Sequence, residues 1–173
     1  MSEQIDIRPA QVADAAALAA FGEQSFMHTF GHIYPPEDKD FFREERFSIT
    51  RTLADLTETE RRIEVAYLAA ELVGFIDYGP MSLPYQPAEP TAIELYRLYV
   101  ASAQKGTGLA HRLMERALAW AKASKVPALY LGVWAYNDRA IAFYRHYGFE
   151  TVGSYDFKVG NTIDDERILR LGL

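Results

Sequence analysis

The chain has 173 residues, of which 49% are hydrophobic and 24% charged, a size and composition that suit one domain with a sizeable core. Its 18 basic and 24 acidic residues give a net charge of −6, so it lacks the basic character of a nucleic-acid-binding protein. The absence of cysteine excludes disulfides, thiolate metal sites and a cysteine nucleophile. No apolar run approaches the ~20 residues of a membrane span, and the start of the chain carries no apolar signal core. We therefore expect a cytoplasmic protein with no membrane or nucleic-acid partner.

The first half of the chain predicts a strand, two helical regions and then two strands. In order, these are a strand at 5–8, a helix at 14–30, a helical region from 37 to about 56, strands at 63–69 and 72–79, and a proline-rich loop at 81–90. Gly22 inside the first helix argues against one unbroken helix, because glycine costs an interior position about 1 kcal/mol against alanine. Pro35 and Pro36 start the second helical region, which we expect to be interrupted near Ser48.

The second half predicts a strand at 93–100, a turn at 104–108, a helix from 108, a strand at 128–133, a helix at 137–146, and two antiparallel strands near 151–159 and 166–173. The continuous apolar run at 128–133 is typical of a strand covered on both faces. The unit from 93 to 133 therefore predicts two parallel strands joined by a helical crossover. The fold class is α/β (α+β), with a mixed sheet.

The turn at 104–108 predicts a phosphate site. It follows a strand and opens a helix, where free backbone N–H groups and the helix dipole, about half a positive charge, favour an anion. Gly106 and Gly108 would let the backbone approach the ligand closely. The Walker and dinucleotide patterns both fail, because Leu109, Ala110 and His111 replace the residues that they need. A plain glycine turn without a ligand remains the alternative.

A second informative stretch spans residues 134–150. Asn137, Ala140 and Tyr144 recur at steps of three and four, which places them on one helix face. The small side chain of Ala140 leaves room for a slender ligand between the amide of Asn137 and the phenol of Tyr144. The alternative is that Tyr144 and its neighbour Phe143 are packing aromatics only.

Together these stretches resemble the two signatures of the GNAT N-acetyltransferases. Residues 103–108 are similar to the Gln/Arg-x-x-Gly-x-Gly/Ala turn that holds the pyrophosphate of coenzyme A, with Ala103 at the first position. Residues 137–149 are similar to the second signature, Asn-x-x-Ala-x-x-x-Tyr-x-x-x-Gly-Phe. Short segments at 25–30, 95–100 and 131–134 further resemble the PaiA-type bacterial GNATs, which are associated with acetylation of spermidine and spermine.

The resemblance implies a single GNAT domain over 1–173. Its expected fold is a central, mostly antiparallel sheet of six to seven strands, with the parallel fourth and fifth strands splayed around the cofactor, and about four helices. The implied reaction moves an acetyl group from acetyl-CoA directly to a primary amine, such as a polyamine, in a ternary complex without a metal. The acceptor would be a small molecule, and a homodimer is among the implied assemblies. His28 and His32 have a metal-like spacing but no evident third ligand.

The residues implied to bind acetyl-CoA lie on both signatures and on the strand before the turn. They are Leu98, Tyr99, Val100, Lys105, Gly106, Thr107, Gly108, Leu109, Ala110, Asn137, Arg139, Ala140 and Tyr144. Backbone amides at 98–100 would hold the developing oxyanion. Tyr144 is the implied acid, which would share its proton with the departing thiolate.

Glu94 is the implied base and would also contact the substrate, together with Phe30 and Tyr34. An unperturbed glutamate, with a pKa near 4.3, is too weak a base unless its pKa is raised or water relays the proton. A surface glutamate without a catalytic role is the alternative for Glu94. For the whole protein, the alternatives are acetylation of a protein, a peptide or an antibiotic amine, and an acyl-CoA sensor without turnover.

Overall fold

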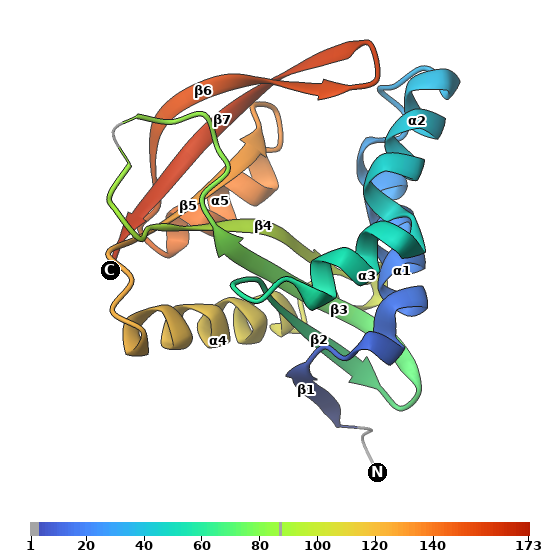
Figure 1. Ribbon diagram of the computed structural model, residues 1–173, viewed down its shortest axis with the longest axis horizontal. Helices are drawn as coiled ribbons and strands as arrows, with labels where there is room; N and C mark the ends of the chain where they lie inside the picture. The colour runs from blue at the N-terminus through green and yellow to red at the C-terminus, as the bar shows by residue number, and fades with distance from the viewer. Residues whose placement is uncertain (1–3, 87) are drawn as a thin grey trace.

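The computed structural model describes residues 4–86 and 88–173, which form a seven-stranded sheet in the order β1-β2-β3-β4-β5-β7-β6 (Figure 1). The strands are β1 (Ile5–Pro9), β2 (Arg62–Leu68), β3 (Glu71–Pro80), β4 (Ile93–Val100), β5 (Ala128–Trp134), β6 (Glu150–Val159) and β7 (Thr162–Gly172). The helices are α1 (Ala15–Phe30), α2 (Pro36–Phe47), α3 (Ile49–Thr57), α4 (Leu109–Ala123) and α5 (Asp138–His146). Only β4 and β5 pair in parallel, and every other neighbouring pair is antiparallel, as expected.

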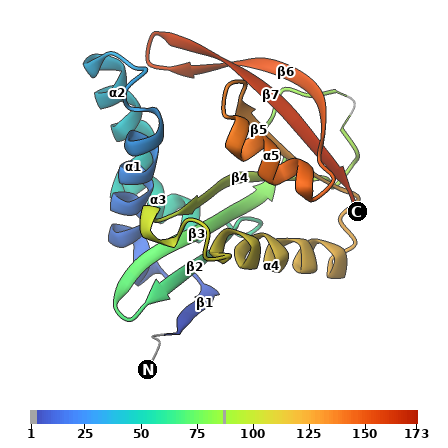
Figure 2. The same ribbon diagram turned by 180° about the vertical axis from the view of Figure 1, so that it is seen from behind.

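Two layers of helices cover the sheet because strand residues alternate between its faces. Ala66 belongs to the main core, where α4 buries Leu113 and Met114, while the adjacent Val65 packs with Leu18 of α1 on the other face. Residues of α5 pack against the same core as α4. The tip of the β6–β7 hairpin lies beside α2 in both ribbon views (Figure 2).

The helix predicted at 14–30 is confirmed, and Gly22 does not interrupt it. α1 runs unbroken through Gly22, because a Cβ there would lie 3.1 Å from the ring of Phe47. The missing side chain lets the helix pack directly against that ring, and this packing offsets the helix-propensity cost of glycine. The interruption predicted near Ser48 is confirmed, since the Ser48 side chain caps α3 by accepting a hydrogen bond from the amide of Arg51. The described residues therefore form five α-helices rather than about four.

The last strand also begins earlier than predicted. β7 starts at Thr162 instead of Glu166, because a two-residue turn links Val159 directly to Thr162. Gly160 supplies the positive φ of +58° that such a turn requires. The carboxylate of Asp38 on α2 accepts hydrogen bonds from the backbone N–H groups of Asn161 (2.8 Å) and Thr162 (3.1 Å). The hairpin tip is thereby tied to α2 across the molecule.

Candidate functional site

The site is organised around a split between β4 and β5. Their pairing covers only Ile93 with Leu129 and Glu94 with Tyr130. Beyond these residues, β4 continues along β3 alone and β5 along β7 alone, so each strand has one free edge. The split gives an extended ligand two strand edges to which it can hydrogen-bond.

Two amides of β4 point into this split. The N–H of Ala101 donates to the carbonyl of Val73 on β3 at 2.8 Å. Because alternate residues of an antiparallel strand bond the same partner, the N–H groups of Leu98 and Val100 face away from β3. These two amides are therefore available to a ligand in the split, whereas the amide of Tyr99 faces β3.

The glycine turn at the end of β4 leaves open space beside the backbone at the N-terminus of α4. Gly106 and Gly108 have φ angles of +84° and +88°, and a Cβ on either would meet nothing within 4 Å. The glycines are therefore required by backbone conformation, and the space beside them is open. Gly108 is the N-cap of α4, whose first-turn N–H groups have no partner within the helix. The hydroxyl of Thr107 donates to the Gln104 carbonyl at 2.8 Å and stabilises the turn.

The second signature forms the start and body of α5. The side-chain oxygen of Asn137 accepts a hydrogen bond from the amide of Ala140 at 3.2 Å, so this oxygen caps the helix. Lys105 and Arg139, the cations implied to bind coenzyme A, are both exposed. Their side chains are thus accessible to an anionic ligand at the surface.

Tyr144 lies on α5 with a half-buried ring that packs against Phe143 and Phe149. Burial raises the pKa of the Tyr144 phenol, and the nearby phenol of Tyr99 adds to the effect. Within residues 4–86 and 88–173, no hydrogen bond engages the Tyr144 hydroxyl. Tyr144 therefore keeps its proton at neutral pH and has a free hydroxyl to donate.

Glu94 lies at the closed end of the split, and its side chain anchors a loop. Its Oε2 atom accepts hydrogen bonds from the Ser82 amide (2.8 Å), the Ser82 hydroxyl (2.8 Å) and the Leu83 amide (3.0 Å). Burial raises the pKa of this carboxyl, and the three hydrogen bonds oppose that rise. These hydrogen bonds show that Glu94 holds loop 81–86 against β4. Its function as a base stays a prediction.

The two aromatic residues implied to contact substrate have different surroundings. Phe30, at the end of α1, meets the ring of Trp134 edge-on at 6.0 Å, so it reaches the open end of β5. Tyr34 is only 7% exposed, stacks on Phe26 at 5.9 Å, and donates its hydroxyl to Asp164 of β7. Tyr34 thus packs against the same Phe26 ring as Phe30 and joins the α1–α2 connection to β7.

Glu166, which no sequence pattern singled out, also lies at the site. It lies on β7 opposite Trp134 of β5 and Tyr155 of β6, so the three side chains share one face of the sheet. Burial, together with the charges of Asp164 and Asp165, raises the pKa of Glu166 to about 8. In sequence it belongs to an ordinary acidic run, and only the pairing of three strands brings it to the site.

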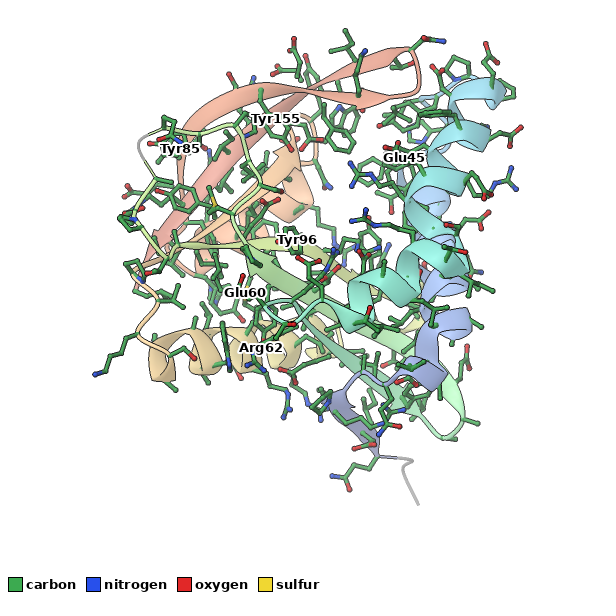
Figure 3. All side chains as sticks on the ribbon, viewed as in Figure 1. Glu45, Glu60, Arg62, Tyr85, Tyr96 and Tyr155 are labelled. Atoms are coloured by element: carbon green, nitrogen blue, oxygen red, sulfur yellow. The ribbon has the colours of Figure 1, made fainter. Side chains whose placement is uncertain are left out.

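Tyrosines surround this face. Figure 3 shows Tyr155 from β6 and Tyr85 from the loop on the same side of the sheet, where both pack against one cluster of buried residues. The Tyr155 hydroxyl reaches the backbone of Gly132, where a Cβ would lie only 2.4 Å from it. Burial raises the pKa of Tyr99 to about 12, and the charge of nearby Glu166 contributes. We call Phe30, Tyr99, Trp134, Tyr155 and Glu166 the aromatic face.

Two features are absent from the part of the chain that the structure describes. It contains no group of three or more histidines, aspartates and glutamates that could hold a metal ion. Among the same residues, no helix has the length and apolar character needed to cross a membrane.

The curated relatives of this chain include N-acetyltransferases. An uncharacterized N-acetyltransferase of Mycobacterium tuberculosis is 28% identical over 158 residues, which cover 91% of this chain and 97% of the relative. The uncharacterized N-acetyltransferase YjgM of Escherichia coli is 34% identical over 108 residues, or 61% of this chain and 63% of the relative.

The fold is similar to solved acetyltransferase structures. The PaiA N-acetyltransferase from Thermoplasma acidophilum, crystallised in complex with coenzyme A, has a TM-score of 0.79 at 21% identity, over 98% of this chain and 99% of that chain. An acetyltransferase from Thermus thermophilus has a TM-score of 0.68 at 24% identity over the full length of both chains. The sequence profile of the acetyltransferase (GNAT) family matches residues 23–149, which include the split, the glycine turn and Tyr144. The chain therefore belongs to the GNAT family of acetyltransferases.

Proposed function

We propose that this acetyltransferase moves the acetyl group of acetyl-CoA directly to a primary amine of a small polyamine. The observation that carries the proposal is the convergence of three features at one split: free amides on β4, an open glycine turn at a helix N-terminus, and the free hydroxyl of Tyr144. A half-buried face of aromatic rings and one carboxylate lies next to them. The first set suits acetyl-CoA, and the second suits a cationic amine.

The residues on the donor side fit coenzyme A. The N-terminus of α4 and the turn at 106–108 would hold the pyrophosphate through backbone N–H groups. The pantetheine arm would lie along β4 and hydrogen-bond the amides of Leu98 and Val100. The PaiA structure, which shares this fold, was crystallised in complex with coenzyme A, and this supports coenzyme A as the ligand of the donor side.

The chemistry needs three contributions from the chain. The acceptor amine must lose a proton, since a primary ammonium has a pKa near that of lysine, about 10.4. The carbonyl oxygen gains negative charge as the amine attacks, and N–H donors such as those of Leu98 and Val100 stabilise it. The departing thiolate accepts a proton, for which the Tyr144 hydroxyl is available.

The acceptor class follows from charge and aromatic surface. The rings of Trp134, Tyr99 and Tyr155 can bind a cation over their faces, and the carboxyl of Glu166 complements its charge. The net charge of −6 adds a general attraction for cationic substrates. A polyamine offers both a reactive primary amine and further cationic groups along an apolar chain.

The test is thiol release from acetyl-CoA with spermidine, a lysine-containing peptide and an aminoglycoside as competing acceptors. We expect spermidine to have the highest kcat/KM, with a KM that rises as ionic strength increases, because salt screens the attraction. A higher kcat/KM for the peptide or the aminoglycoside would refute the polyamine assignment. Tight coenzyme A binding with no turnover of any amine would instead indicate an acyl-CoA sensor.

The donor site has its own test at Gly108. Gly108→Glu should reduce coenzyme A affinity at least about tenfold, because it puts a carboxylate beside the pyrophosphate and strains a backbone at φ +88°. Gly148→Ala is the matched control, since Gly148 also has a positive φ (+92°) but lies after α5. Calorimetry should find normal affinity for the control. Unchanged affinity in a folded Gly108→Glu protein would contradict the assignment.

A further inference from the structure

The mechanism requires a proton acceptor for the substrate ammonium, and two buried or half-buried carboxyls lie near the split. Glu94 is at its closed end, and one of its oxygens is already occupied by three hydrogen bonds from Ser82 and Leu83. Glu166 is at the open end, opposite Trp134. In the part of the chain that the structure describes, no hydrogen bond or ion pair engages the Glu166 carboxyl.

We propose that Glu166 is the general base that accepts the proton of the acceptor ammonium, and that Glu94 positions the loop above the site. The inference rests on the proposed function, because it assigns a residue to that reaction. It goes beyond the sequence-based prediction, which gave the base function to Glu94.

Three strands position Glu166 toward the reacting groups. Its partners in register are Trp134 and Tyr155, and the Tyr99 phenol is near enough for the charge of Glu166 to raise its pKa. Tyr99 stands between Leu98 and Val100, whose amides face the split. Glu166 is therefore on the acceptor side of the position where the acetyl carbonyl would lie.

The neighbouring charged groups explain why Glu166 is suited to take a proton. On β7, Asp164 accepts a hydrogen bond from the Tyr34 hydroxyl, and Asp165 forms an ion pair with Arg167. Burial, and after it the charges of both aspartates, raise the pKa of Glu166 to about 8. The titratable groups that face it from β4, β6 and the α1–α2 connection are the phenols of Tyr99, Tyr155 and Tyr34. An approaching ammonium favours the carboxylate form, and a base with a pKa near the working pH is effective.

The proposed step balances in protons and bonds. The ammonium nitrogen transfers one proton to the Glu166 carboxylate, and the freed lone pair forms a C–N bond with the acetyl carbonyl carbon. As the C–S bond breaks, the thiolate takes the proton of the Tyr144 hydroxyl, and the second nitrogen proton returns to the Tyr144 oxygen through solvent. The amide nitrogen keeps the third proton, and Glu166 releases its proton to solvent when the products leave.

The kinetic test compares pH profiles of kcat/KM for spermidine. For the wild type, kcat/KM should rise as pH increases through 8. For Glu166→Gln, kcat/KM should lose this rise and should be lower than that of the wild type by about 10²–10⁴ at pH 8. Glu166→Asp should recover part of the loss. Asp156→Asn, an exposed carboxylate on β6, is the matched control and should match the wild type. An ascending limb near pH 8 that survives in Glu166→Gln would overturn the proposal.

A second readout does not depend on turnover. In protein labelled with ¹³C-glutamate, the carboxyl signal absent from Glu166→Gln should titrate near pH 8, and Asp165→Asn should lower that midpoint by removing a like charge. A midpoint near 4–5 overturns the proposal even if no amine is acetylated. If another amine proves to be the substrate, the polyamine assignment fails. The pH profiles of the wild type and Glu166→Gln are then measured with that amine, and they still test the role of Glu166.

Stability separates a base from a structural residue. Because the folded protein holds the Glu166 proton up to about pH 8 while an unfolded glutamate loses it near 4.5, wild-type stability falls as pH rises between these values. Glu166→Gln cannot ionise, so its Tm at pH 8–9 should exceed that of the wild type. A Tm that falls together with activity would identify a packing role and refute the proposal.

Discussion

Replacing Tyr144 with phenylalanine should lower the rate constant for acetyl transfer by about 10²–10⁴, the usual range for a positioned acid. The substitution removes one oxygen and leaves the ring packed against Phe143 and Phe149. Affinity for coenzyme A should fall by no more than one hydrogen bond, about 1 kcal/mol. A large loss of rate with little loss of coenzyme A affinity would identify Tyr144 as an acid. If Tyr144 were only a packing residue, its replacement would lower the stability of the protein and its affinity for coenzyme A together.

The measurement is a single-turnover rate with acetyl-CoA and spermidine under conditions where chemistry limits the rate. Tyr147→Phe is the matched control, because Tyr147 lies on the same segment and its hydroxyl pairs with His111 at 2.7 Å instead of facing the split. We expect the control to keep the wild-type rate. Near-wild-type transfer by Tyr144→Phe would mean that the thiolate departs unassisted and that Tyr144 is a contact for the cofactor.

Replacing Asp77 with alanine should destabilise the protein by about 3–5 kcal/mol, the usual cost of breaking a buried ion pair by removing one partner. Asp77 on β3 is fully buried and accepts hydrogen bonds from Arg61 (2.7 and 2.8 Å) and Arg97 (2.6 and 2.9 Å). Without this carboxylate, two guanidinium groups beneath α3 would share only Asp55. Urea unfolding gives the difference in free energy.

The matched control for this network is Asp40→Ala, which breaks the exposed pair of Asp40 with Arg43 on α2. Surface pairs contribute about 0–1 kcal/mol, so we expect a small change. Burial alone would raise the pKa of Asp77, but Arg97 and Arg61 outweigh it and hold the pKa below its usual value. The stabilisation from Asp77 is therefore present at neutral pH and is lost as pH falls through that lowered pKa. Equal losses in the two variants would contradict the buried-network account.

The local elements of this fold were predictable from sequence, because their signals are local. The glycine turn at 104–108, the interruption at Ser48 and the parallel pair formed by 93–100 and 128–133 are confirmed. The helix predicted at 14–30 is confirmed, with Gly22 inside it, whereas the start of the last strand was wrong, since this strand begins at Thr162 instead of Glu166. Contacts with distant residues, Phe47 for Gly22 and Asp38 for the hairpin turn, stabilise both conformations.

By itself, the sequence determined that the chain has two GNAT signatures, and it placed Tyr144 and the glycine turn on them, because these features depend on spacings within one element. The tertiary structure alone decided which carboxyl lies at the open end of the split. Strand register between β5, β6 and β7 depends on long-range pairing, and a shift of one residue would turn Glu166 to the opposite face of the sheet. The burial that raises its pKa comes from the same pairing, so no local pattern at residues 164–166 could identify it.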